Sequence, residues 1–229
     1  MKFKGITDVF FDLDHTLWDF NKNSALTFNK VFEINNLNVD LNKFLSYYES
    51  INLKYWKLYR EEKIDKEFMR FGRLFDAFTA IDIRLEKNII NKLSEDYIIH
   101  LRSFNHLFEN TFEILEYLKT NYNLHIITNG FSKIQQIKME NSKINHYFKT
   151  ITNAESVGVK KPNPKIFNHA LRVANVNPNQ SIMIGDSYEA DILGAMNMGM
   201  KAIFFGVYKK DLDTEIKQVD NLILLKNFL

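Results

Sequence analysis

The 229-residue chain contains no cysteine, which excludes disulfide bonds, thiolate metal sites, iron–sulfur clusters and cysteine nucleophiles. Any catalysis therefore depends on oxygen and nitrogen groups. A membrane-spanning helix needs about 18 or more consecutive apolar residues, and no such run occurs in the sequence. The first residues also lack the pattern of a signal peptide. We therefore expect a cytoplasmic protein with no membrane partner.

An excess of charge of one sign is also missing. Thirty Lys and Arg residues stand against 28 Asp and Glu residues, which leaves a formal net charge of +2. Such a surface does not attract polyanions in general, so we expect no nucleic-acid polymer among the partners. The composition, 45% hydrophobic and 25% charged, is that of a globular protein with a sizeable core. The sequence gives no indication of the oligomeric state.

Proline and glycine are scarce and unevenly distributed. All three prolines and seven of the eight glycines lie outside residues 17–105. Because both residue types interrupt helices, this segment is predicted to be helical. Apolar residues at three- and four-residue spacing within it predict four amphipathic helices. These span residues 23–36, 40–62, 65–81 and 86–102.

The rest of the chain alternates between short apolar runs and helical patterns. The runs are apolar at consecutive positions, as expected of parallel strands that are covered on both faces. Alternating strands and helices predict an α/β fold with a doubly wound, Rossmann-like parallel sheet. Its core spans residues 1–16 and 106–229, with an all-helical domain inserted at 17–105. The predicted strands are 6–11, 124–128, 149–152, 181–184 and 202–205, and the helices are 109–121, 131–143, 164–175 and 188–198.

Polar residues follow three of the predicted strands, and a lysine ahead of a proline precedes the fourth strand. In an open parallel sheet, ligands bind beyond the carboxyl ends of the strands. We therefore expect these polar side chains to meet at one edge of the sheet. They are Asp12 and Asp14 after the first strand, Thr128, Asn129 and Gly130 after the second, Lys161 before the fourth, and Asp186 and Asp191 after it.

Carboxylates at such an edge repel one another unless a cation lies among them. The candidate ligands are all oxygens, which favours Mg²⁺. Magnesium also keeps positions for water and phosphate oxygens, so Asp12, Asp186 and a backbone carbonyl suit it better than a complete protein cage. Thr128, the amides that follow it and the Lys161 ammonium would donate to a phosphoryl group. The pattern predicts Mg²⁺ as cofactor and a small phosphorylated metabolite as substrate.

Four stretches of the sequence resemble the motifs of the haloacid dehalogenase superfamily. They are FFDLDHTLWDF, TNGFSKIQQIKMENSKI, ESVGVKKPNPKIF and MIGDSYEADILGAMNMGM, and they match the DxDxT, strand-end Thr, Lys and GDSxxxD motifs in order. The chain is most similar to phosphatases with a helical cap, in particular the pyrimidine 5′-nucleotidase family that accepts non-standard nucleotides. The resemblance covers the whole chain and implies that residues 17–105 form the cap domain.

The resemblance also implies a role for each matched acid and for the lysine. Asp12 would attack phosphorus and form an aspartyl phosphate, and Asp14 would protonate the leaving oxygen and later activate water. Asp12, the main-chain carbonyl of Asp14 and Asp186 would bind Mg²⁺, and Asp191 would orient the water shell of the metal. Lys161 would screen the charges of the nucleophile and the phosphoryl group.

The substrate-binding residues are predicted around the second motif and the start of the cap. Thr128 would hold one phosphoryl oxygen, together with the amides of Asn129 and Gly130. Trp18 and Phe20 are candidates for stacking on a nucleobase, although aromatic side chains at a domain junction more often only pack. The other aromatic residues of the cap are expected to form its core.

The motifs identify a phosphoryl group and a metal but leave the rest of the substrate open, so the cap must select it. We expect a nucleoside 5′-monophosphate, with a sugar phosphate, phosphoglycolate or pyrophosphate as the alternative. A phosphomutase would need its aspartyl phosphate to survive water, and the Asp12/Asp14 pair argues against a non-enzymatic phospho-receiver. A carbon–halogen hydrolase would not need proton transfer by Asp14. In the cap, Arg70 and Arg73 are three residues apart and could share a helix face toward a substrate anion, but we expect them to lie in solvent.

Overall fold

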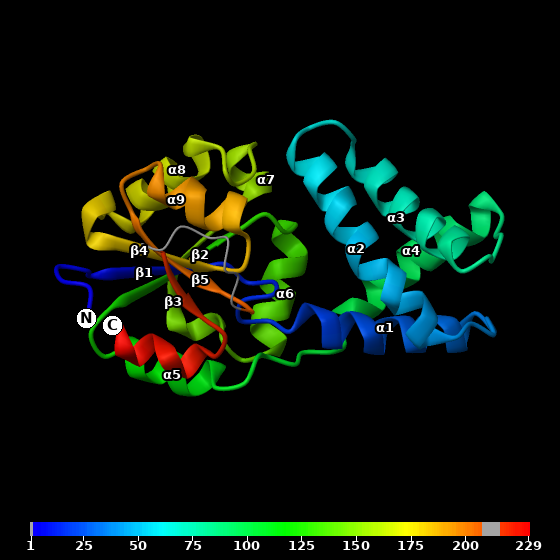
Figure 1. The fold of residues 1–229 in the computed structure, drawn as a ribbon, viewed down its shortest axis with the longest axis horizontal. Coiled ribbons are helices and arrows are strands. Elements are labelled where there is room, and N and C mark those ends of the chain that lie inside the picture. The colour runs from blue at the N-terminus through cyan, green and yellow to red at the C-terminus, as the bar shows by residue number, and fades with distance from the viewer. Residues whose placement is uncertain (1, 208–215) are drawn as a thin grey trace. The chain divides into compact units, whose positions relative to one another are not determined.

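The computed structural model describes residues 2–207 and 216–229, and the chain divides into two compact units (Figure 1). The first, here called the α/β unit, consists of Met1–Asp19 and Asn105–Leu229. The second, the helical unit, consists of Phe20–Phe104. The sequence places the boundary at residue 17, whereas the structure groups Trp18 with the α/β unit, because Trp18 forms β-bridges to Asp14 and Leu107.

A parallel six-stranded sheet forms the centre of the α/β unit (Figure 1), with the strand order β3-β2-β1-β4-β5-β6. All residues of β1 and β4 are buried, as their uninterrupted apolar runs predict. The predicted fold class is confirmed, and the structure adds a short sixth strand. The strands are β1 (Asp8–Phe11), β2 (Asn123–Thr128), β3 (Phe148–Asn153), β4 (Ser181–Gly185), β5 (Lys201–Phe205) and β6 (Lys217–Val219).

Helices cover both faces of the sheet, with α8 and α9 over one face and α5 over the other (Figure 1). Between β4 and β5 the predicted helix is divided into a π-helix and a short α-helix. The α-helices of this unit are α5 (Thr111–Leu118), α6 (Ser132–Asn141), α7 (Ala154–Val157), α8 (Pro164–Ala174) and α9 (Gly194–Met196). The remaining helical segments are the π-helix η3 (Tyr188–Leu193) and the 3-10 helices η1 (Asn145–Tyr147), η2 (Pro178–Gln180) and η4 (Leu222–Asn227).

The strand order reverses between β1 and β4, which lie side by side at the middle of the sheet. Phe11 at the end of β1 is opposite Ile126 of β2 and Ile184 of β4. The residues that follow these strands therefore leave the sheet at the same edge. A crevice at such a reversal point is the usual ligand site of doubly wound sheets.

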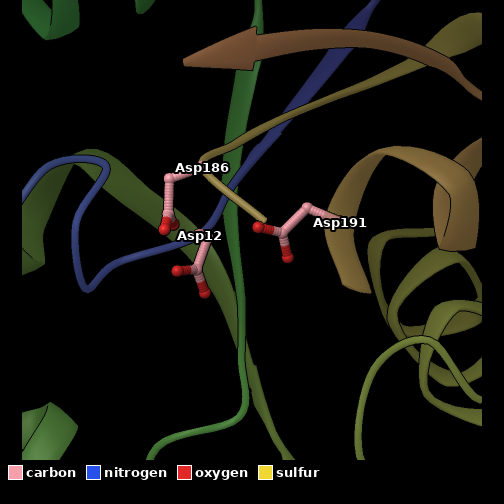
Figure 2. A group of neighbouring side chains, drawn as sticks. All are labelled: Asp12, Asp186 and Asp191. Atoms are coloured by element: carbon pink, nitrogen blue, oxygen red, sulfur yellow. The ribbon is translucent and has the colours of Figure 1, made fainter. Parts of the chain in front are cut away.

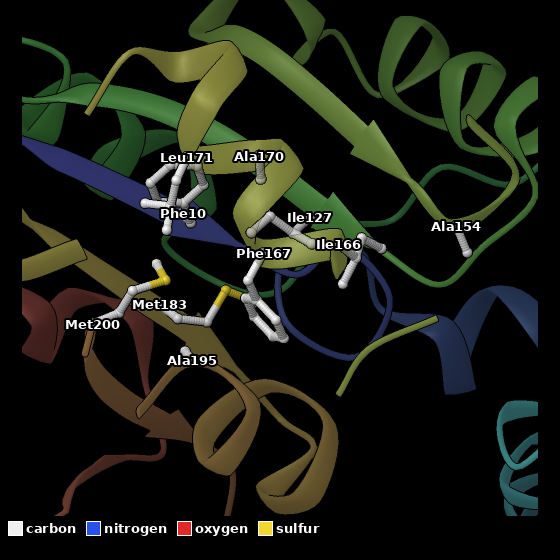
Figure 3. Close-up of a cluster of buried hydrophobic side chains, with 10 residues drawn as sticks. All are labelled: Phe10, Ile127, Ala154, Ile166, Phe167, Ala170, Leu171, Met183, Ala195 and Met200. Atoms are coloured by element: carbon white, nitrogen blue, oxygen red, sulfur yellow. The ribbon is translucent and has the colours of Figure 1, made fainter. Parts of the chain in front are cut away.

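Helix α8 packs on the sheet through a cluster of buried apolar side chains (Figure 3). Pro164 begins the helix, and the side chain of Asn163 caps it by accepting from the amide of Lys165 at 3.0 Å. Its buried residues recur at helical spacing, so one face of α8 meets the sheet. Each such side chain contributes ~1.5–3 kcal/mol by leaving water. The cluster contains Phe10, Ile127 and Met183 from the strands and Ile166, Phe167, Ala170 and Leu171 from α8.

The helical unit contains the four predicted helices. Aromatic side chains fill its interior, and the ring of Phe28 lies 4.8 Å from that of Phe44 and 4.5 Å from that of Tyr97. Only part of the cap aromatics form this core, because Tyr47, Phe68 and Phe75 are exposed, and the expectation that most of them are core residues is wrong. In the part of the chain that is described, no helix combines the length and apolar character needed to cross a membrane. The helices are α1 (Phe20–Ile34), α2 (Leu41–Arg60), α3 (Lys66–Ala80) and α4 (Lys87–Leu101).

Arg73 of α3 lies inside this unit, and the expectation that it faces solvent is wrong. Its side chain is 3% exposed. The guanidinium donates to Asn52 Oδ1 at 2.9 Å and lies 5.2 Å from the ring centroid of Tyr97. An amide oxygen and an aromatic face thus replace water around this cation. Helical spacing alone does not reveal these partners, because they come from α2 and α4.

Candidate active site

Three carboxylates meet where β1 and β4 end (Figure 2). Asp12 follows β1, and its amide donates to Ile184 O of β4 at 2.9 Å. Asp186 follows β4, and Asp191 comes from η3 (Figure 2). One oxygen from each of the three side chains lies within 4.8 Å of the others. The structure therefore brings together three of the four acids that the sequence placed at this edge.

Two local features hold the later acids in place. Thr16 donates to Asp186 Oδ1 at 3.2 Å, and the amide of Ser187 donates to Asp191 Oδ2 at 3.0 Å. Gly185 leaves room for Asp191, because a Cβ at position 185 would lie 2.3 Å from Asp191 Oδ2. The glycine of the fourth motif is therefore required by close packing against a carboxylate.

Lys161 is the cation at the centre of this cluster. Its Nζ lies 2.6 Å from Asp12 Oδ1 and 2.7 Å from Asp191 Oδ1, and it donates to Ile127 O at 2.6 Å. The side chain of Asn129 forms two hydrogen bonds with the main chain of Lys161. Asn129 Oδ1 accepts from the Lys161 amide at 2.7 Å, and Asn129 Nδ2 donates to the Lys161 carbonyl at 3.1 Å. The sequence predicts that the main-chain amide of Asn129 binds the phosphoryl group. The structure adds a contact of the Asn129 side chain with the main chain of Lys161.

Burial governs the charges of these groups. Burial raises the pKa of Asp12 to about 7, opposed by Lys161 and reinforced by Asp191. Burial also raises the pKa of Asp186 well above its usual range, and the charges of Asp191 and Asp12 add to this effect. Burial alone would lower the pKa of Lys161, but the adjacent Asp12 and Asp191 raise it.

One lysine faces three carboxylates here, so the cluster carries an excess of negative charge when its acids are ionised. A divalent cation would remove that excess, and three carboxylate oxygens are ligands suited to a hard ion such as Mg²⁺. The donor set therefore fits the predicted metal. The three carboxylates are those of Asp12, Asp186 and Asp191.

Thr128 and Asp14 share a second group of contacts. Gln135 Nε2 donates to Thr128 Oγ1 and to Asp14 Oδ2, at 2.8 Å in both cases. Lys138 Nζ lies 2.5 Å from Asp14 Oδ1. The amide of Gly130 donates to Thr128 Oγ1 at 3.1 Å. The predicted substrate and acid–base residues are thus connected through one helix, α6.

Sequence reasoning missed Gln135 and Lys138. Both are nearly inaccessible, with 1% and 2% of their surface exposed. One signal could have found them, since they are three residues apart on a helix that begins just after the β2 motif. Such residues share one face of a helix and can point to the same neighbour.

The two aromatic candidates lie in different units. The Lys138 ammonium is 4.1 Å from the ring centroid of Trp18, so a cation occupies one face of that indole. Phe20 is the first residue of α1 and is buried. Stacking of a nucleobase on either ring stays a prediction.

Residues 9–205 match the family model described as haloacid dehalogenase-like hydrolase. The chain belongs to this family. This match spans all four motifs, which lie at β1, the end of β2, the residues before α8 and the end of β4, and the resemblance inferred from them is confirmed.

Two known enzymes are similar to this chain over most of its length. The pyrimidine 5′-nucleotidase YjjG of Escherichia coli is 31% identical over 205 residues, which are 89% of this chain and 87% of YjjG. A glyceraldehyde 3-phosphate phosphatase of Methanothermobacter thermautotrophicus is 32% identical over 234 residues, covering 96% of this chain and 98% of that enzyme. Both relatives are phosphatases, so the chain is a phosphohydrolase of this family.

A solved structure supports the fold at full length. The HAD-hydrolase YfnB of Bacillus subtilis, solved bound to magnesium, superposes with a TM-score of 0.86 at 25% identity. The match covers 97% of each chain. Both the sheet and the helical insertion therefore have a counterpart in a known member of the family.

Proposed function

We propose that this protein is a Mg²⁺-dependent phosphomonoesterase that works through an aspartyl phosphate on Asp12 and prefers nucleoside 5′-monophosphates. The proposal rests on one observation, that two carboxylates of the site have different neighbours. Asp12 contacts the buried Lys161 and lies beside Asp186, whereas Asp14 contacts Gln135 and Lys138. Two carboxylates in different surroundings can act as nucleophile and as proton carrier.

In the first step, an oxygen of Asp12 attacks phosphorus. The bond from phosphorus to the ester oxygen breaks, and its electron pair stays on that oxygen, which takes a proton from Asp14. Lys161 offsets the negative charge of the nucleophile and the transferring group. Thr128 donates to a phosphoryl oxygen.

In the second step, water attacks the same phosphorus and gives a proton to Asp14. The bond between phosphorus and the Asp12 oxygen breaks, so inorganic phosphate leaves and the Asp12 carboxylate is restored. Asp14 regains the proton that it supplied in the first step. The cycle therefore returns both acids to their initial states.

Asp12, Asp186 and the main-chain carbonyl of Asp14 would hold Mg²⁺. When bound, this ion supplies positive charge that offsets the charge of the phosphoryl group. Asp191 stays with Lys161 and the Ser187 amide, and acts on the water around the metal. The magnesium in the YfnB structure supports this assignment.

We propose that the helical unit is the predicted cap domain and that it recognises the part of the substrate beyond the phosphoryl group. YjjG, a pyrimidine 5′-nucleotidase, supports a nucleotide substrate. The similarly related glyceraldehyde 3-phosphate phosphatase supports the second candidate, a small phosphorylated sugar. Stacking on an aromatic side chain is worth ~1–3 kcal/mol per base, which would favour nucleotides if the unit offers such a side chain.

A panel of phosphate esters tests both candidates. With Mg²⁺ present, kcat/KM is measured for uridine 5′-monophosphate, glyceraldehyde 3-phosphate, phosphoglycolate and glycerol phosphate. We expect the nucleotide to exceed the others by about tenfold or more, equivalent to ~1.4 kcal/mol. A preference for glyceraldehyde 3-phosphate would overturn the nucleotidase assignment alone. Failure to hydrolyse p-nitrophenyl phosphate and every ester of the panel would overturn the phosphatase mechanism.

A further inference from the structure

Gln135 uses both hydrogens of its side-chain amide inside the candidate active site. They are donated to Thr128 Oγ1 and Asp14 Oδ2, both at 2.8 Å. Once Asp14 has given its proton to the leaving oxygen, its carboxylate only accepts hydrogen bonds, so the Gln135 nitrogen must face Asp14 in that state. That partner fixes the orientation of the amide.

The same amide determines what the hydroxyl of Thr128 can do. The hydroxyl oxygen of Thr128 accepts from Gln135 Nε2 at 2.8 Å and from the Gly130 amide at 3.1 Å. A hydroxyl has two acceptor positions and one hydrogen. With both acceptor positions filled, Thr128 interacts with a further ligand as a donor, and phosphoryl oxygens are acceptors.

Gly130 provides the space that this arrangement requires. A Cβ at position 130 would lie 2.4 Å from both Cδ and Nε2 of Gln135. The backbone of Gly130 is outside the positive-φ region, so what opposes alanine there is contact with the Gln135 side chain, which would have to move. The glycine after the second motif and the glutamine of α6 therefore form one structural unit.

We propose that Gln135 is a positioning residue that couples the phosphoryl-binding hydroxyl of Thr128 to the acid–base carboxylate of Asp14. This inference rests on the proposed function and extends it to Gln135, a residue of the second stretch to which the resemblance assigns no role. One rigid amide sets the geometry of phosphoryl binding and of proton transfer together. Small displacements of such groups reduce catalysis far more than they reduce binding.

The first test replaces Gln135 by methionine, which has a similar volume but no hydrogen-bond donor. Gln136→Met is the matched control, because Gln136 bonds to Glu140 at the surface. Steady-state kinetics are measured with p-nitrophenyl phosphate and with glycerol phosphate. For Gln135→Met we expect kcat to fall roughly 10- to 100-fold while KM changes less than about threefold. The loss is larger with glycerol phosphate, which has the poorer leaving group and needs Asp14 more. Gln136→Met keeps wild-type kinetics.

The second test is a double-mutant cycle between positions 130 and 135, which stays informative if the methionine variant folds poorly. Gly130→Ala in the wild-type chain pushes Gln135 aside, so kcat falls to a similar extent. In a Gln135→Ala background the added methyl group has space, and the further loss is less than about threefold.

Two results would overturn the role of Gln135: wild-type kcat on both substrates for Gln135→Met, or additive losses in the cycle. Both require an active wild-type enzyme. An inactive wild-type enzyme would instead contradict the proposed function, so the two failures are distinguishable. Folding of every variant is checked by circular dichroism and Tm.

Discussion

At the scale of single residues, two glycines of the site are explained by a neighbouring side chain that lies where a Cβ would otherwise be. Gly130 faces Gln135, and Gly185 faces Asp191. Neither has a positive φ, so conformational freedom is not the reason for glycine at these positions. Each glycine lets a functional side chain approach the backbone.

We expect Gly185→Ala to impair catalysis through Asp191. The added Cβ would lie 2.3 Å from Asp191 Oδ2 and must displace a carboxylate that contacts Lys161. We expect kcat/KM to fall by about tenfold or more, with a loss of roughly 1–3 kcal/mol in unfolding free energy. Gly194→Ala is the control, because its Cβ would meet Phe167 at 2.7 Å in the apolar core. That variant loses stability but keeps its kcat/KM, and wild-type kcat/KM for Gly185→Ala would contradict this reading.

The acids and the lysine of the site can be predicted from the sequence, whereas buried polar residues on the helices cannot. Asp12 and Asp186 follow buried apolar runs, so the ends of β1 and β4 fix their positions whatever the surrounding helices do. Gln135 and Arg73 are polar residues on helices, for which solvent exposure is the usual outcome. Their burial depends on contacts with other elements, which no local pattern encodes.

At the scale of elements, apolar residues at three- and four-residue spacing predict most helices and consecutive apolar runs predict most strands, because burial follows the same patterns. Exceptions are short or irregular. β6 has only three residues, too few for a strand pattern. The helix predicted at 188–198 begins as the π-helix η3, and this segment carries Asp191 within reach of the Ser187 amide. Such π segments often occur at functional sites, and sequence periodicity does not reveal them.

A buried polar group also joins β1, β2 and β3, away from the carboxyl ends of β1 and β2 that carry the candidate site. His125 Nε2 lies 2.9 Å from Asp8 Oδ1, and His125 Nδ1 lies 2.8 Å from Thr150 Oγ1. A neutral imidazole with its proton on Nε2 satisfies both partners, since it donates to the carboxylate and accepts from the hydroxyl. Asn123 supports the same carboxylate by donating to Asp8 Oδ1 at 3.0 Å.

This group predicts a pH dependence of stability. Burial lowers the pKa of His125, opposed by Asp8 and reinforced by the charge of Lys149. Above about pH 6.5 the histidine is neutral in both folded and unfolded chains. As the pH falls below that value, the unfolded chain binds a proton more readily than the folded chain, so stability decreases.

Urea unfolding at pH 7.5 and pH 5.5 measures this effect, with His125→Gln as the comparison. We expect the wild type to lose more unfolding free energy between the two pH values than the variant does. Equal losses would show that His125 is not the responsible group.

At the scale of the whole molecule, the fold and the catalytic motifs identify a phosphohydrolase but do not select its substrate. Two relatives of almost equal identity act on a pyrimidine nucleotide and on glyceraldehyde 3-phosphate, according to their names. The sequence predicts the core because every motif follows a strand of one sheet. It does not predict the substrate, because specificity depends on a few side chains of the helical unit, Phe20–Phe104.

Metal binding is expected to change the stability of the whole fold. Buried like charges at Asp12, Asp186 and Asp191 oppose folding, and Mg²⁺ that binds only the folded chain stabilises it by mass action. At a concentration of ~100 times the Kd the gain is ~2.7 kcal/mol, or about 5–11 °C in Tm at 2–4 °C per kcal/mol. Asp186→Asn removes one of these charges. It should raise the Tm without metal and reduce the response to Mg²⁺, and a full Mg²⁺ response in this variant would contradict the assigned site.

The central claim is that Asp12 carries the phosphoryl group during turnover. Enzyme mixed with Mg²⁺ and substrate is quenched rapidly, reduced with borohydride, digested and analysed by peptide mass spectrometry. Borohydride converts an acyl phosphate to an alcohol and leaves free carboxylates intact. We expect this reduction at Asp12, dependent on substrate and absent from Asp12→Asn. Steady turnover with an unreduced Asp12, or reduction at a different acidic residue, would contradict it.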